Sequence, residues 1–143
     1  MKELIWVGPF AIEDLLRHSI DESYSRPPES GSAYMVTLHS WQGRPTIECR
    51  PLYIGGNTGR SKRFRTRIGD LLADLFGFFG EETAHHSGGQ SLHRYCRENN
   101  INPLELHIAW VKMAECHRCL EVDLYSRLKP LLNRRVPPKC SDH

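Results

Sequence analysis

Long apolar runs, a targeting segment and a strong net charge are all missing from this sequence of 143 residues. The apolar stretch from Leu4 to Ile12 ends at Glu13 and Asp14, and no small-residue cleavage site follows it. No apolar run approaches the length that spans a bilayer. These absences argue against a secreted or membrane-embedded protein, and we expect a cytoplasmic protein that does not bind membranes.

A disulfide framework is also missing, because the cysteines are odd in number and irregularly spaced. We expect reduced thiols in a cytoplasmic protein. The five cysteines are Cys49, Cys96, Cys116, Cys119 and Cys140. A zinc site at Cys116 and Cys119 is the alternative, but one Cys-x-x-Cys pair needs two further ligands. The candidates for these are His85, His86, Cys96 and Cys140. We favour thiols without zinc, because the pair falls within a predicted helix.

The net charge of +2 is weak, but the basic residues are unevenly distributed. The stretch 60–67 has five bases and no acid, and a second basic stretch covers 127–139. The first stretch contains Arg60, Lys62, Arg63, Arg65 and Arg67. A basic patch on a nearly neutral protein predicts a local site for a polyanion such as DNA. The simpler alternative is a solvated helix face.

The length and the order of predicted elements indicate one α/β (α+β) domain. After a short strand at 4–7 and a helix carrying Ile12, Leu15 and Leu16, a Pro-containing loop leads into the main fold. The remaining predicted elements are strands at 33–38, 46–54 and 104–111, and helices at 61–76, 91–99 and 114–128. We divide the chain into an N-terminal extension (1–30), a domain (31–136) and a tail (137–143).

The first two strands of this domain are predicted to form a hairpin in a defined register. If Tyr34 faces Tyr53, the turn centres on Gly43 and Arg44. A glycine at the first central position suits a type II′ turn, so the turn and the tyrosine pair select the same register. The segment 77–89, which holds His85, His86 and the Gly88–Gly89 pair, is predicted to be a loop.

Several polar residues follow one another along this fold in an order that suits phosphodiester cleavage. They are Tyr34, Tyr53, Arg63, Glu121 and Asn133. Arg60, Arg63 and Arg67 share one side of their helix, beside its apolar stripe, where they would either bind phosphate or only snorkel. Glu121 falls at the margin of an apolar stripe, where a carboxylate needs a compensating cation. That cation is either Mg²⁺ or a salt-bridge arginine.

At these positions the chain resembles the GIY-YIG nucleases from about Gly31 to Asn133. Ser32-Ala33-Tyr34 stands for the first motif, and Tyr53-Ile54-Gly55 matches the second. Arg63 corresponds to the helix arginine of the family, Glu121 to its metal-binding glutamate and Asn133 to its terminal asparagine. The resemblance implies a three-stranded antiparallel sheet flanked by helices.

The resemblance also implies a reaction, namely hydrolysis of DNA with Mg²⁺ or Mn²⁺. Tyr53 would act as general base, Tyr34 would support it, and Arg63 would stabilise charge on the phosphoryl oxygens. Glu121 would hold the metal. Asn133 would orient the substrate or anchor the site. Arg60, Lys62, Arg65 and Arg67 would contact DNA.

Some features depart from the family pattern. The first motif lacks its leading glycine and isoleucine, and Gly56 replaces a lysine that many members carry. The segment around His85–Gly89, together with His93, has no counterpart, and we expect it to contact DNA or complete the site. The alternative is a surface loop ordered by the glycine pair. The alternative function is a catalytically inactive nucleic-acid-binding module with the same fold. With no separate recognition domain, target specificity would come from the N-terminal segment, this loop, a homodimer or a protein partner.

Overall fold

The computed structural model describes residues 4–17, 33–56, 63–78, 87–111 and 116–133. Its described part is an α+β domain built on a four-stranded antiparallel sheet. The predicted fold class, α+β, is therefore confirmed. The strands are β1 (Trp6–Ala11), β2 (Ala33–Thr37), β3 (Pro51–Gly56) and β4 (His107–Val111). The helices are α1 (Ile12–Arg17), α2 (Phe64–Leu75), α3 (Ser87–Glu98) and α4 (His117–Leu128), with short 3₁₀ turns η1 (Ile47–Cys49) and η2 (Pro103–Glu105).

The prediction of three strands was wrong, because the N-terminal segment adds a fourth. The strand order is β1-β4-β2-β3, and β1 pairs with β4 from Trp6 opposite Val111 to Ala11 opposite His107. Without β1, the outer edge of β4 would leave backbone N–H and C=O groups unpaired beside the core. Residues assigned to an extension are therefore part of the sheet.

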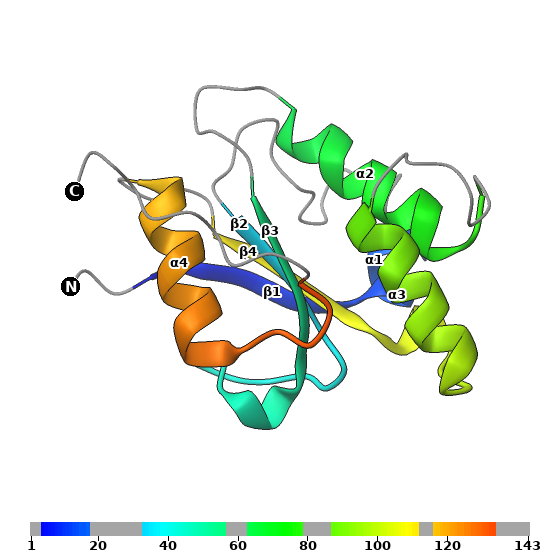
Figure 1. Cartoon of the computed structure of the whole chain (residues 1–143), viewed down its shortest axis with the longest axis horizontal. Helices are drawn as coiled ribbons and strands as arrows, with labels where there is room; N and C mark the ends of the chain where they lie inside the picture. Colours follow the sequence, from blue (N-terminus) through cyan, green and yellow to red (C-terminus); the bar gives the residue numbers. More distant parts are fainter. Residues whose placement is uncertain (1–3, 18–32, 57–62, 79–86, 112–115, 134–143) are drawn as a thin grey trace.

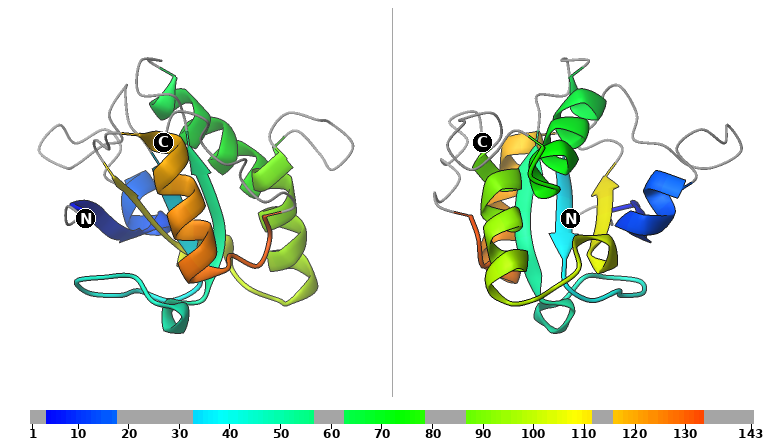
Figure 2. Two further views of the ribbon diagram at one scale, coloured as in Figure 1. Left: turned by 60° about the vertical axis from the view of Figure 1, so that its left-hand side comes forward. Right: turned by 90° about the vertical axis from the view of Figure 1, so that its right-hand side faces the viewer.

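Helices cover both faces of the sheet, with α2 and α3 on one face and α4 on the other (Figures 1 and 2). Alternate residues of β2 point to opposite faces of the sheet. Tyr34 and Val36 belong to the core under α2 and α3, whereas Ala33 and Met35 pack with α4. All five residues of β2 are buried, as expected for a strand covered on both faces. In the described parts of the chain, no helix is long and apolar enough to cross a membrane.

The predicted hairpin register was wrong by two residues. Tyr34 lies opposite Gly55, and Tyr53 lies opposite Val36, with an irregularity between Val36 and Thr37. No tight turn joins the strands, because β2 ends at Thr37 and β3 begins at Pro51, after η1. The shift is an even number of residues, so both tyrosines keep the same face of the sheet.

Three further boundaries differ from the sequence prediction. Helix α3 begins at Ser87, so Gly88 and Gly89 lie in its first turn rather than in a loop. The segment before β4 forms η2, where Asn102 Oδ1 accepts a hydrogen bond from the Leu104 N–H. Cys116 is the N-cap residue of α4, so the Cys-x-x-Cys pair straddles the start of that helix.

The exposed side of β3 is covered by the chain that follows α4. The Leu131 and Leu132 N–H groups donate to the carbonyl oxygens of Pro51 (3.1 Å) and Leu52 (2.7 Å). The chain turns into this position at Lys129, which adopts a left-handed conformation with φ 46°. Pairing of this kind protects an edge strand, and it brings Asn133 beside the strand that carries Tyr53.

Candidate active site

The two tyrosines form the centre of the candidate site. They are diagonal neighbours on adjacent strands, with ring centroids 6.1 Å apart. A side-chain hydrogen bond links them. Tyr34 is fully buried and Tyr53 is only partly buried, so Tyr53 is the phenol within reach of a substrate.

Two glycines leave the space that these rings occupy. A Cβ atom at Gly55 would overlap the Tyr34 ring and hydroxyl, and a Cβ atom at Gly88 would overlap the Tyr53 ring. Gly88 lies in the first turn of α3, so this helix forms a wall of the site. No role for Gly88 was predicted from the sequence, although a glycine pair is typical of positions where another group approaches the backbone closely.

The surroundings of the two phenols make them unequal. Burial is the largest cause that raises the pKa of both. The shared hydrogen bond lowers the pKa of Tyr53 and raises that of Tyr34, which means that it favours ionisation of Tyr53. The positive charge of Arg67 also lowers both pKa values. Of the two, Tyr53 is therefore the better proton acceptor.

Arg67, rather than Arg63, is the arginine of α2 whose charge acts on the phenols. Arg63 is the exposed N-cap residue of the helix, and Arg67 lies one turn further along, partly buried. The Arg67 Nε atom is buried and has no hydrogen-bond partner within the described residues. A buried guanidinium N–H without a partner is costly, and an anionic ligand would satisfy it.

Glu121 approaches the same phenols from α4. It is partly buried, and burial raises its pKa, while Arg67 and Arg118 oppose this shift. Its negative charge in turn raises the pKa of both tyrosines. Glu121 thus interacts electrostatically with both tyrosines and with Arg67.

Asn133 is an anchor of the strand beside Tyr53. Its Oδ1 accepts a hydrogen bond from the Ile54 N–H, and its Nδ2 donates to the Ile54 carbonyl, both at 2.8 Å. The amide therefore imitates a neighbouring strand next to the residue that follows Tyr53. Of the two roles predicted for Asn133, this geometry accounts for the anchoring role.

The remaining predicted contacts are only partly described. Arg65 is exposed on α2, whereas Arg60, Lys62, His85 and His86 lie outside the described residues. His93 is held within the fold, because its Nδ1 is 3.0 Å from the Leu75 carbonyl oxygen. DNA contacts by the basic stretch remain a prediction.

The acidic and thiol residues are the groups that could hold a metal ion. In the described ranges, no three residues of the His, Cys, Asp or Glu type form a group that could enclose a metal. Cys116 Sγ accepts a hydrogen bond from the Cys119 N–H at 3.4 Å, which gives the first thiol a capping role, and Cys140 is not described. Mg²⁺ needs less from the protein, since one or two carboxylates with waters and phosphate suffice. The partly buried Glu121 fits that requirement.

No family model, no curated protein and no solved structure matches this chain.

Proposed function

We propose that this protein is a metal-dependent endonuclease that hydrolyses DNA phosphodiester bonds with Mg²⁺ or Mn²⁺. One observation carries the proposal: two tyrosines with ring centroids 6.1 Å apart share a hydrogen bond and lie within the electrostatic influence of the partly buried Arg67 and Glu121. A cation, a carboxylate and a phenol that can accept a proton are the groups that phosphodiester hydrolysis requires. The resemblance to the GIY-YIG nucleases at Tyr34, Tyr53 and Glu121 supports this proposal.

The reaction assigns a role to each group. Water attacks the phosphorus atom, a new P–O bond forms, and the bond to the leaving ester oxygen breaks. Tyr53 orients the water and accepts its proton, and the leaving oxygen takes a proton from solvent. Tyr34 donates its hydrogen bond to the Tyr53 oxygen, so the negative charge that develops there is stabilised.

Arg67, Arg63 and a metal held by Glu121 would interact with the phosphate. Arg67 binds a phosphoryl oxygen from its partly buried position on α2, and Arg63, the exposed N-cap residue of α2, adds a second positive charge. When bound at Glu121, the metal would supply positive charge to the phosphate and the leaving oxygen. Arg67 also compensates for the lysine that Gly56 replaces, because it brings a positive charge to the phenols from α2.

The second candidate is a nucleic-acid-binding module without catalysis. The raised pKa of Tyr53 favours it, because a base that ionises less removes protons less effectively. A simple assay separates the two candidates: supercoiled plasmid is incubated with the protein and Mg²⁺, and with EDTA as control. The enzyme produces nicked and linear plasmid only with the metal, whereas the binding module retards the plasmid on a gel without cutting it.

A further inference from the structure

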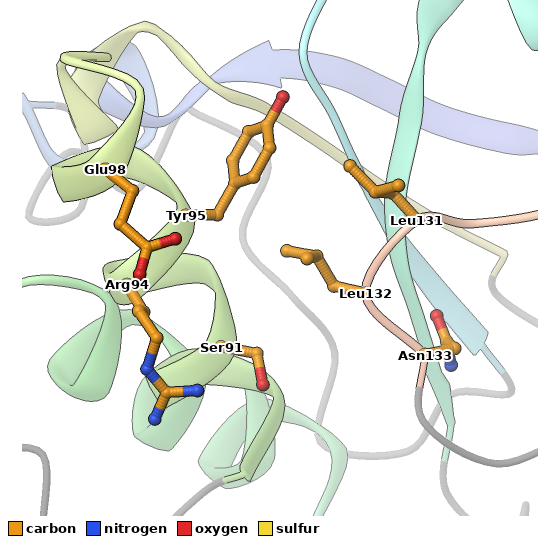
Figure 3. A pocket seen from close by; sticks show the side chains of 7 residues that line it. All are labelled: Ser91, Arg94, Tyr95, Glu98, Leu131, Leu132 and Asn133. Atoms are coloured by element: carbon orange, nitrogen blue, oxygen red, sulfur yellow. The ribbon is translucent and has the colours of Figure 1, made fainter.

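A cleft of about 260 Å³ lies between α3 and the segment that follows α4 (Figure 3). One wall consists of Ser91, Arg94, Tyr95 and Glu98 of α3, and the other includes Leu132 and Asn133. The volume is near the lower limit of small-molecule sites, so the cleft has room for about one nucleotide and not for a duplex.

The cleft lies beside the candidate active site, because both of its walls adjoin residues that contact Tyr53 or its neighbour Ile54. Gly88, Ser91 and Tyr95 are spaced i, i+3 and i+7, so they share one face of α3. The Tyr53 ring packs against Gly88, one helical turn from Ser91. On the other wall, Asn133 is hydrogen-bonded to Ile54, the residue after Tyr53. A DNA strand with a phosphate at Tyr53 would therefore have its neighbouring nucleotide close to the cleft.

Charges of both signs are arranged in order along the α3 wall. The Arg94 side chain extends toward the Ser91 end of the helix, whereas the Glu98 carboxylate lies beside the start of the Arg94 side chain and the Tyr95 ring points away from it (Figure 3). Arg94 and Glu98 are spaced i, i+4, yet they are not joined in an ion pair in the described structure. The Tyr95 ring is partly buried against the core and lines the cleft as part of the α3 wall.

We propose that this cleft binds one unpaired nucleotide of the substrate strand, next to the phosphate that is cut. Arg94 binds the phosphate of that nucleotide, and its base stacks on Tyr95. The Glu98 carboxylate accepts a hydrogen bond from an exocyclic amine of the base, as carboxylates do with cytosine N4. Thymine has no such amine. The inference rests on the proposed function and extends it to a substrate class, namely DNA with a single-stranded segment at the cut.

The test measures binding of two fluorescein-labelled oligonucleotides, hexadeoxycytidylate and hexathymidylate, by anisotropy in EDTA. The unsubstituted protein should bind the cytosine probe about fivefold more tightly, as expected for one base contact. Arg94→Gln should weaken binding of both probes about fivefold and reduce the salt slope by about 0.7. Glu98→Gln should remove the cytosine preference, because an amide also donates to the thymine carbonyl.

Arg97→Gln is the matched control, since Arg97 is an exposed arginine of the same helix that does not line the cleft. It should change the affinity less than twofold. Equal effects of Arg94→Gln and Arg97→Gln, or an unchanged preference in Glu98→Gln, would overturn the inference. Circular dichroism of each variant excludes misfolding as the cause.

Plasmid cleavage by the same preparations separates this inference from the proposed function. If cleavage is absent but the binding pattern holds, the cleft is a nucleotide site on a module that does not cut. If cleavage requires Glu121 but the two arginine variants bind alike, the nuclease proposal stands and the cleft inference fails.

Discussion

The Tyr53 ring packs directly against Gly88, and this contact joins the candidate base on β3 to the first turn of α3. A methyl group at Gly88 would occupy the position of the ring. Gly88→Ala should therefore displace Tyr53 and reduce cleavage at least tenfold, because catalysis is sensitive to small misplacements. Initial rates of plasmid nicking measure the effect.

Gly69→Ala is the control for that substitution. Gly69 also lies in a helix, but a Cβ atom there would meet nothing within 4 Å. Alanine should increase the free energy of unfolding by about 0.5–1 kcal/mol and leave cleavage unchanged. If both glycine variants cleave at the parental rate, the packing of Tyr53 against α3 has no part in the reaction.

The hydroxyl groups of the tyrosines are tested by phenylalanine substitutions. Tyr53→Phe should lower cleavage about a hundredfold, because the ring remains and the proton acceptor is lost. Tyr34→Phe should reduce cleavage less, since it removes only the donor that favours ionisation of Tyr53.

The rate of the parent protein should depend on pH. Burial raises the pKa of Tyr53, so its ionised fraction, and with it the rate of cleavage, should increase from pH 7 to 9. A parental rate that does not respond to pH in this range would argue for another base.

The two arginines of α2 should differ in their effects. Arg67→Gln should reduce cleavage about a hundredfold, because it removes a partly buried charge that acts on both phenols. Arg63→Gln should reduce it less than tenfold, because Arg63 is exposed to solvent. The ratio of kcat/KM values measures the difference. The opposite ranking would support Arg63 as the principal arginine, as the resemblance implies.

Asn133 is expected to stabilise the fold. Asn133→Ala removes two hydrogen bonds to the Ile54 backbone and should cost about 1–3 kcal/mol in the free energy of unfolding. Asn102→Ala removes one exposed hydrogen bond to Leu104 and should cost less than about 1 kcal/mol. Urea unfolding compares the two variants, and equal costs would contradict the anchoring role.

Much of the architecture was predictable from local patterns. The apolar stripe of 64–75 and the β-forming run at 33–37 specified α2 and β2. The contribution of β1 to the sheet was not predictable, because it depends on the long-range pairing of Trp6 with Val111. The register of β2 and β3 failed for a related reason: the chain between them forms η1 instead of a tight turn.

The site was predictable as a set of residue types but not as a geometry. The order of Tyr34, Tyr53, Glu121 and Asn133 could be read from the sequence. The choice between Arg63 and Arg67 could not, because both lie on one side of α2 and only packing shows which charge reaches the phenols. The cleft was equally hidden, since its two walls are more than 30 residues apart in the sequence.

Glu121 links the proposed chemistry to the stability of the protein. Burial raises the pKa of its carboxyl, so the ionised group disfavours the folded state as the pH rises through its titration. Glu121→Gln should therefore increase the melting temperature at pH 7, and the difference should vanish below the ordinary pKa of a carboxyl. Mg²⁺ should raise the melting temperature of the parent but not of the variant. A decrease at pH 7 would indicate a salt-bridge role instead.

The most direct test of the nuclease proposal is the rate of Mg²⁺-dependent plasmid cleavage by folded Glu121→Gln protein, with Glu48→Gln as an exposed control. Glutamine preserves the size of the side chain but removes the negative charge that the metal needs. Cleavage should be abolished in Glu121→Gln and unchanged in Glu48→Gln, while DNA binding persists in both. Cleavage by folded Glu121→Gln at the parental rate would contradict the proposed site.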